Sequence, residues 1–464
     1  MPTTAAPRYD TLARSAITAG PIRRTLFVLA LPVLGEQMLN FVVGLFDTVL
    51  AGRISPAATS AVGFAAYVGW LASMLAMLVA TGTTALVARH EGARDHDEAN
   101  RFANQSLTLG CAVGMAVLAL IFAIAPWLAK QQHMTGETYA ITVHYLRMDA
   151  IGHAFMSITI VGSAALRGAG NMRTPMFVFA VVNAFNIVVS LSLVYGLGPL
   201  PPLGVSGIVG GTVSARTLGA LIMIVVLARG RAGLRLRPRE LMPDRRCVTR
   251  ILRIGIPAAG DGAVMWAGHF MFLTIIASLA VGEIGRAYYA AHMIAVRTEA
   301  LTYLPAVAWG TAAATMIGQA IGAADPARAR RVGHEAVFQC GCLAVLVAAA
   351  FYVGARGIYA VMSTDALVRT AGVGPFRILA LLTPLLVVSI VYVHGLRGAG
   401  DTRYPLLITM AGTLVIRLVL GWLFGVHYQW GLLGAWMGMF CDMIWRAGAA
   451  SIRYAGGRWL ATAV

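Results

Sequence analysis

A few ionisable side chains interrupt the long apolar segments of this sequence, and they are the residues that could do chemistry. Asp47 lies in the first apolar segment, 15 positions after Pro32. A carboxylate inside an apolar span is costly unless it is neutralised or paired. A carboxyl group that opens to one membrane face and then to the other can bind a proton at the first and release it at the second. We therefore predict that Asp47 exchanges an ion; the alternative is a structural hydrogen bond near a helix end.

Two amides in a later apolar segment are candidate partners of this carboxyl group. Asn183 and Asn186 lie three positions apart and so share one face of a helix. Either amide could hydrogen-bond Asp47, or it could join two helices by a polar contact. Both alternatives stay open.

Two further acids each follow a proline by four positions: Glu36 follows Pro32, and Asp261 follows Pro257. Proline removes a backbone donor and kinks a helix, which lets water reach that depth. We expect both acids either to line the cytoplasmic mouth of a cavity or to be solvated near the interface.

The remaining charges of the last two apolar segments are expected to be structural. Asp442 and Arg446 are four positions apart, so they face each other on one side of a helix and neutralise each other. Arg417 is expected to hold its helix through a carboxylate or through backbone carbonyls. His269 is either a proton relay or a polar contact between helices.

The elements that carry these residues are predicted to be membrane-spanning helices. The chain has 464 residues, of which 58% are hydrophobic and 12% charged. Its length accommodates roughly ten to fourteen spans of about 20 residues, and the apolar segments are too long and too continuous for barrel strands. The composition rules out disorder and argues against a water-soluble enzyme. We place twelve helices, near 25–51, 60–88, 103–129, 139–166, 174–197, 204–228, 251–279, 286–318, 333–357, 373–396, 404–425 and 430–450.

The net charge of +17 is spread over short segments between these helices. A nucleic-acid-binding protein would gather it on one polar domain, so no nucleic-acid partner is expected. Arginines crowd alternate connections, which by the positive-inside rule predicts that the tails 1–24 and 451–464 are both cytoplasmic. The five cysteines are odd in number and form no CxxC pair, so neither a disulfide framework nor a metal site is expected.

An internal repeat divides the chain into two halves. Residues 167–176 read RGAGNMRTPM, and residues 397–406, 230 positions later, read RGAGDTRYPL. Such a repeat predicts two copies of a six-helix unit in the same orientation, a plan common in secondary transporters. The predicted lobes are 25–228 and 251–450, joined by a cytoplasmic, arginine-rich linker at 229–250.

Three patterns carry a resemblance to a known family. They are the proline, aspartate and small-residue exit of the first span (Pro32, Asp47, Thr48, Ala51, Gly52), the two RGAG loops, and Gln319, Gly322 and Ala323 at the end of the eighth span. In this order on twelve spans they resemble the multidrug and toxic compound extrusion (MATE) family of cation-coupled efflux transporters. The resemblance implies two six-helix lobes forming a V, a substrate cavity between or within them, and alternating access driven by proton or sodium entry.

The resemblance also implies where the ion binds. In one branch of the family the ligands lie in the first lobe, and the matching positions are Asp47, Asn186 and Thr212, which could hold Na⁺; Ser190 stands where that branch has an acid or an amide. The other branch uses a glutamate in the seventh span, where this sequence has Met265. The second ion site is therefore expected to be absent, with Asp261 as a possible substitute.

We predict a monomeric antiporter of the bacterial cytoplasmic (inner) membrane. It would export drug-like, often cationic compounds, driven by protons at Asp47, with sodium less favoured and no cofactor. A lipid-linked precursor or polysaccharide flippase is the nearest alternative. It would need a strongly cationic cavity for a pyrophosphate, which is not expected because we place the arginines in loops. An intramembrane enzyme would need a motif such as HExxH, which is not found, and a channel would not need duplicated lobes with paired proline kinks.

Overall fold

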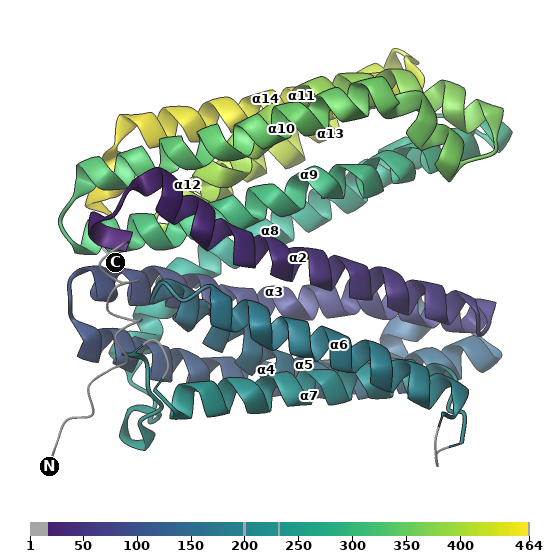
Figure 1. Cartoon of the computed structure of the whole chain (residues 1–464). Helices are drawn as coiled ribbons and strands as arrows, with labels where there is room; N and C mark the ends of the chain where they lie inside the picture. The colour runs from purple at the N-terminus through teal and green to yellow at the C-terminus, as the bar shows by residue number, and fades with distance from the viewer. Residues whose placement is uncertain (1–16, 198–200, 231–232, 463–464) are drawn as a thin grey trace, which may run out of the picture. The chain divides into compact units, whose positions relative to one another are not determined.

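A computed structural model describes residues 17–197, 201–230 and 233–462, which are almost entirely helical and include no strand (Figure 1). The long helices are α2 (Ile22–Gly52), α3 (Pro56–Gly92), α4 (His96–Gln131), α5 (Gly136–Gly168), α6 (Arg173–Tyr195), α7 (Val205–Ala228), α8 (Arg245–Ser278), α9 (Gly282–Gly322), α10 (Pro326–Met362), α11 (Ala366–Gly398) and α14 (Gly431–Gly456). Between α11 and α14 one helical segment comprises α12 (Arg403–Thr409), a π-helical stretch Met410–Arg417, α13 (Leu418–Trp422) and a second π-helical stretch Leu423–His427.

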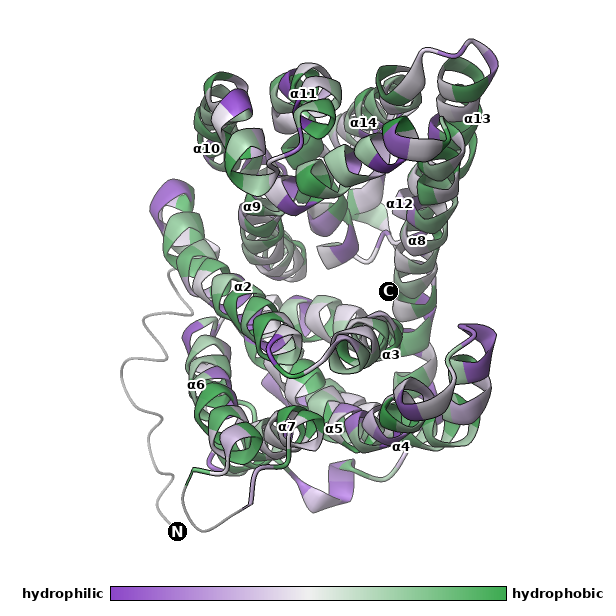
Figure 2. Cartoon of the chain, turned by 90° about the vertical axis from the view of Figure 1, so that its right-hand side faces the viewer, coloured by the Kyte–Doolittle hydropathy of each residue, from purple (hydrophilic) through white to green (hydrophobic). Residues whose placement is uncertain are grey.

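The prediction of an all-α membrane protein with twelve long helices is confirmed. Within the described ranges, 11 helical segments are long and apolar enough to cross a membrane, and α14 is the twelfth helix. Figure 2 shows hydrophobic residues along the helices and hydrophilic residues mainly at their ends and connections. Several helices extend past their predicted ends: α9 has 41 residues, about 60 Å at the usual rise, and so exceeds the roughly 30 Å hydrocarbon core.

The helix ends reproduce the internal repeat at atomic detail. Asp95 and Asp325, 230 positions apart, each accept a hydrogen bond from a backbone N–H at the start of the next helix, Asp95 from Glu98 and Asp325 from Arg328. Arg94 and Ala324, one position earlier in each repeat, both have a positive φ, of 61° and 57°. The two halves therefore share caps and turns as well as sequence.

The described chain forms two compact units, each with the same packing order. Unit 1 contains Leu31–Gly255, and unit 2 contains Pro21–Ala30 and Ile256–Val464. In unit 1, α5 packs on α3 and α4. In unit 2, α11, which lies at the equivalent place in the repeat, packs on α9 and α10.

The unit boundaries differ from the predicted lobes at the start of α2 and of α8. The first turns of α2 belong to unit 2, because Arg23 pairs with Glu335 at 2.9 Å and Phe27 packs edge-on against Trp309. The first turns of α8 belong to unit 1. Gly255 lies so close to α3 that a Cβ there would stand 2.2 Å from a backbone oxygen, that of Leu78.

The predicted linker 229–250 is hydrogen-bonded to α4 between Arg235 and Asp244. Three buried amides of α4 reach its backbone: Asn100 accepts from the Arg235 N–H at 2.6 Å, Asn104 accepts from the Arg237 N–H at 3.1 Å, and Gln105 accepts from the Asp244 N–H at 2.8 Å. The segment is thus an ordered part of unit 1.

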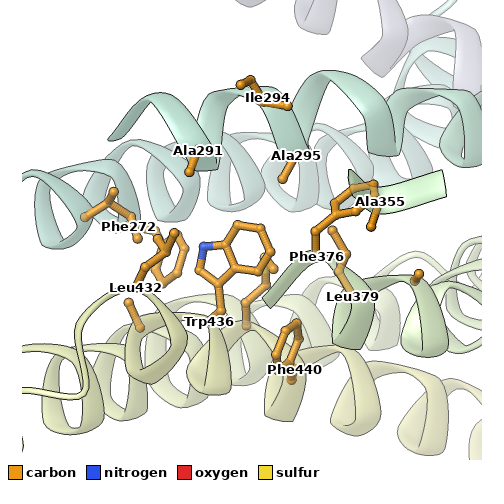
Figure 3. Packing of buried hydrophobic residues seen from close by; sticks show 14 of the residues in the cluster. Phe272, Ala291, Ile294, Ala295, Ala355, Phe376, Leu379, Leu432, Trp436 and Phe440 are labelled. Carbon is orange, nitrogen blue, oxygen red and sulfur yellow. The ribbon is translucent and has the colours of Figure 1, made fainter. Parts of the chain in front are cut away.

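Large aromatic side chains fill the core of unit 2 (Figure 3). Trp436 is completely buried and meets Phe440 edge-on, with ring centroids 6.2 Å apart. Tyr359 packs edge-on against Phe376 and donates a hydrogen bond to the Ala291 carbonyl oxygen at 2.8 Å. In unit 1, Leu50 of α2 belongs to a buried apolar cluster with Tyr145 and Leu146 of α5. This cluster fixes the part of α2 that carries Asp47.

Candidate functional site

A cavity of about 310 Å³ lies inside unit 1, among α2, α5, α6 and α7. Four of the five predicted ion-coupling residues line it, namely Asp47, Asn183, Asn186 and Thr212. The other lining residues are Asn40, Val43, Gly44, Met156, Thr159, Phe179, Val182, Ala215, Arg216 and Gly219. Half of these fourteen lining residues are polar or charged, so the wall combines apolar surface with several hydrogen-bonding groups, as is common for small-molecule sites.

Asp47 is half-buried on α2, and one of its carboxylate oxygens lacks a partner. Its Oδ1 atom is shielded from solvent and makes no hydrogen bond with any described residue. The neighbouring Thr48 is exposed and bonds its own helix, at Gly44 O. A buried carboxylate oxygen without a donor is costly when it carries charge, so the position fits a group that takes up a cation.

The amides of α6 connect the cavity wall to α2 and α7. Asn183 donates to Asn40 Oδ1 of α2 at 3.0 Å, and Asn186 donates to Thr212 Oγ1 of α7 at 3.3 Å. The Asn186 side-chain oxygen is buried and has no hydrogen-bond partner among the described residues. Three oxygens of residues that line this cavity, from Asp47, Thr159 and Asn186, thus have no hydrogen-bond partner among the described residues.

Ser190 is not among the residues that line this cavity. It is fully buried one turn further along α6 and packs against Gly211 of α7, where a Cβ would lie 2.1 Å from the serine Oγ. The short side chain at 190 is matched by a missing side chain at 211, so these two helices approach closely.

Three charged or titratable side chains near the cavity were missed by the sequence analysis. Arg216 of α7 lines the cavity and donates from Nη1 to Asp149 Oδ1 of α5 at 2.7 Å. The other Asp149 oxygen lies 3.1 Å from His153 Nε2. A charged residue inside an apolar span was the available signal, together with the i, i+4 spacing of Asp149 and His153. The placement of the arginines in loops was therefore wrong for Arg216.

Glu36 and Asp261 are buried in ion pairs, which is evidence against the alternative that they are solvated near the interface; a position at the mouth of a cavity stays a prediction. Arg167 Nη2 lies 2.5 Å from one Glu36 oxygen and 2.7 Å from the other, and Arg397 pairs with Asp261. Glu36 is 4% and Asp261 3% exposed. The two arginines open the RGAG repeats, so each repeat delivers a cation to its own acid.

Pro32 and Pro257 lie inside the continuous helices α2 and α8. Pro32 is buried and Pro257 half-buried. Each stands one turn before its paired acid.

Unit 2 carries a buried group of three charges. Asp442 accepts hydrogen bonds from Arg417 at 2.9 and 2.5 Å, and its other oxygen lies 2.8 Å from Arg446 Nε. Met265 stands where one branch of the MATE family, which this sequence resembles, has a glutamate. Its sulfur lies 3.3 Å from Arg446 Nη1 and 3.5 Å from Thr413 Oγ1. Two arginines thus share one carboxylate, with an uncharged thioether beside them.

Comparisons with known proteins agree with this architecture. The sequence profile of the MatE family matches residues 32–191 and 269–423. The "Probable multidrug resistance protein NorM" of Thermotoga maritima is 29% identical over 443 residues, covering 96% of this chain and 94% of that protein. The "Multidrug resistance protein PmpM" of Pseudomonas aeruginosa is 26% identical over 444 residues, covering 93% and 91%. A MOP superfamily transporter from Pyrococcus furiosus has a similar fold, with a TM-score of 0.88 at 22% identity over 98% of both chains.

Proposed function

The chain belongs to the MatE family, and on that premise we propose that it is a multidrug efflux antiporter that exports organic, often cationic compounds in exchange for protons bound at Asp47. The relatives named for multidrug resistance support the efflux role. The observation that carries the proposal is the half-buried carboxylate with an unpartnered oxygen in the wall of the unit 1 cavity.

Proton and substrate would compete for the same carboxylate. Ionised Asp47 attracts a cationic compound into an apolar space, whereas protonated Asp47 is neutral and removes that attraction. A proton can drive export only if it binds one state of the transporter more tightly than the other. Protonation at Asp47 therefore shifts unit 1 toward the state that releases substrate.

Sodium is the less favoured coupling ion. Oxygens of Asp47, Asn186 and Thr212 are the groups that would hold it. Ser190, which replaces an acid or an amide of the sodium-binding branch, does not line the cavity. The set of sodium ligands that the resemblance implies is therefore incomplete here for a cation that keeps its charge, whereas a proton needs only one oxygen.

We also propose that the protein acts as a monomer in the bacterial cytoplasmic membrane, with both termini cytoplasmic and without a cofactor. Its long apolar helices support insertion in a bilayer. The arginines of the 229–250 segment support a cytoplasmic position for that connection, and an even number of spans returns both termini to that side.

A lipid-linked precursor or polysaccharide flippase remains the alternative. The helices do contain arginines: Arg216, Arg417 and Arg446 each have a carboxylate partner, whereas Arg297 of α9 is exposed. A pyrophosphate carries several negative charges and would need a group of cations to bind it, whereas Arg216 is the one cation in the wall of the unit 1 cavity as described. The antiporter therefore fits these charges better.

Dye efflux from inside-out vesicles under an imposed proton or sodium gradient tests the proposed function. We expect the native chain to transport ethidium when a proton gradient is applied, and Asp47→Asn to lose at least nine-tenths of that rate. Glu137→Gln, which changes an exposed acid at the start of α5, is the matched control. Undiminished, gradient-dependent transport by Asp47→Asn would reject the role of this carboxyl group.

A further inference from the structure

We propose that Arg216 is a built-in counter-ion for Asp47, and that it makes this carboxyl group select protons over sodium. The inference rests on the proposed function, since it explains how the same cavity distinguishes two coupling ions. It concerns three side chains in the middle of unit 1, Arg216, Asp149 and His153, which we call the Arg216 triad.

Asp149 binds one nitrogen of the Arg216 guanidinium, and the other nitrogens remain available for a second carboxylate. Arg216 donates from Nη1 to Asp149 Oδ1 at 2.7 Å and lies 3.5 Å from the Asp149 backbone oxygen. Its other guanidinium nitrogens make no hydrogen bond with a described residue. Since a guanidinium has five N–H donors in a fixed fork, Arg216 can keep Asp149 and still pair with a second carboxylate.

Asp149 is a positioning residue that lies behind Arg216. It is 6% exposed and is not among the residues that line the cavity, whereas Arg216 is. One carboxylate oxygen faces Arg216 and the other lies 3.1 Å from His153 Nε2, so contacts on both sides fix the orientation of the carboxylate. The ion pair therefore presents its positive end to the cavity that holds Asp47.

Glycines make room for the triad. A Cβ at Gly152 of α5 would lie 3.0 Å from Arg216 Cδ and 3.1 Å from Arg216 Nη1. A Cβ at Gly69 of α3 would lie 2.8 Å from His153 Nε2. The glycines thus leave the space that the Arg216 and His153 side chains occupy, which indicates that the packing of these helices includes both side chains.

The groups that face Asp47 determine its preference among cations. On α7 this group is Arg216, which lines the cavity with Asp47, whereas the buried titratable groups of α5, namely Tyr145, Asp149 and His153, are not among the residues that line it. From α6 only amides and apolar side chains line the cavity, and α3 has no charged residue before Arg89. Arg216 is therefore the one cation in the cavity wall as described.

A tethered cation weakens the binding of every other cation to the same carboxylate. A proton tolerates this loss, because it forms an O–H bond and needs no further ligand. Sodium keeps its charge, needs several oxygens and binds carboxylates weakly, so the same loss removes its binding at ordinary concentrations. When the proton leaves, Arg216 offsets part of the Asp47 charge in place of sodium, and the remaining attraction together with the apolar part of the cavity wall holds an organic cation.

The test compares Arg216 variants of the full-length protein in proteoliposomes. Ethidium transport is measured with a proton gradient between pH 5.5 and 8.5, and with a sodium gradient against a choline gradient. Arg216→Gln alone would strand the buried Asp149, so the main variant is Arg216→Gln with Asp149→Asn, which keeps an uncharged polar pair. Arg216→Lys retains the charge. Arg147→Gln, on the exposed Arg147 that donates to the Phe122 backbone oxygen, is the matched control.

We expect the double variant to shift the midpoint of the pH profile upward by about one unit, a tenfold change in proton affinity, and to gain at least fivefold in the ratio of sodium-driven to choline-driven transport. Arg147→Gln should match the native chain in both measurements, and Arg216→Lys, which keeps the charge but loses the fork, should fall between the native chain and the double variant.

Other outcomes separate the two proposals. A native chain without proton-driven transport would overturn the proposed function. Proton-driven native transport combined with an unchanged pH midpoint and sodium response in the double variant would overturn the counter-ion role alone. Uniform loss of transport at every pH in a folded double variant would make Arg216 a substrate ligand and would likewise overturn it.

Discussion

Arg167 and Glu36 form a buried ion pair in unit 1, and Arg397 and Asp261 form its counterpart in unit 2. Each arginine is the last residue but one of its helix and the first residue of an RGAG repeat, and each acid stands one turn after a proline. The duplication therefore preserves a specific contact between α2 and α5, and between α8 and α11. Its repetition in both units shows that this contact belongs to the architecture.

Glu36→Gln is predicted to destabilise the protein by about 3–5 kcal/mol, because removing one partner leaves the guanidinium of Arg167 buried without a counter-charge. The change is measured as a lower Tm in detergent. Glu283→Gln, on an exposed acid 3.9 Å from Arg286, is the control and should leave Tm unchanged. Adding Arg167→Met to Glu36→Gln should restore most of the loss. A single variant as stable as the native chain would contradict this prediction.

Asp442→Asn is predicted to be the most damaging single charge change in unit 2. It would leave both Arg417 and Arg446 buried without their shared carboxylate. We expect loss of the monodisperse peak in size-exclusion chromatography at temperatures where the native chain is intact. Asp97→Asn, at a carboxylate that is 86% exposed, is the matched change and should elute as the native chain does.

The two RGAG repeats offer a matched pair of glycine substitutions. A Cβ at Gly398 would lie 2.3 Å from the Ala314 backbone oxygen, whereas a Cβ at Gly168 would lie 3.0 Å from the Thr84 backbone oxygen. Gly398→Ala should therefore lower Tm clearly more than Gly168→Ala does, since backbone must move in the first case. Gly354→Ala, which meets only a side-chain methyl at 3.8 Å, should raise Tm slightly or leave it unchanged. Equal effects at 398 and 168 would argue against this close approach of α9 and α11.

Asn104→Ala is predicted to expose the arginine-rich segment to trypsin. Asn104 accepts from the Arg237 N–H and donates to the Arg235 carbonyl oxygen at 3.0 Å, so its removal frees the backbone between them. We expect cleavage after Arg235 or Arg239 to become about tenfold faster, which corresponds to a loss of about 1.4 kcal/mol of local stability. Gln131→Ala, at the exposed end of α4, is the control. Unchanged cleavage would mean that other contacts hold the segment.

The sequence predicted those features of the molecule that depend on short stretches of neighbouring residues. Long apolar runs indicated twelve helices, and a repeated ten-residue motif indicated duplication. The helix ends were less accurate, because α9 continues through polar residues at both ends where hydropathy falls. Asp47, Asn183, Asn186 and Thr212 were singled out as one site, and all four line one cavity.

Pairings over long sequence distances could not be read from one sequence. Glu36 and Arg167 are separated by 131 positions, and Asp149 and Arg216 by 67. Nothing in the composition or periodicity of either segment identifies its partner, since only the folded helices bring the charges together. The same reasoning explains why the pair of Asp442 and Arg446 could be predicted from their i, i+4 spacing. For Arg417 the sequence allowed either a carboxylate or backbone carbonyls as the partner, and it did not identify Asp442.

The exchange of helix ends between the units constrains how the protein is made. Because unit 1 ends only at Gly255, its packing is incomplete until the ribosome has translated past the arginine-rich segment. Residues Pro21–Ala30 leave the ribosome early, but they can pack only after α9 and α10, which they contact, have been synthesised. If the chain were cut between the six-helix halves, each fragment would lack residues that belong to its unit. Coexpression of the two fragments would be needed to complete the packing of both units.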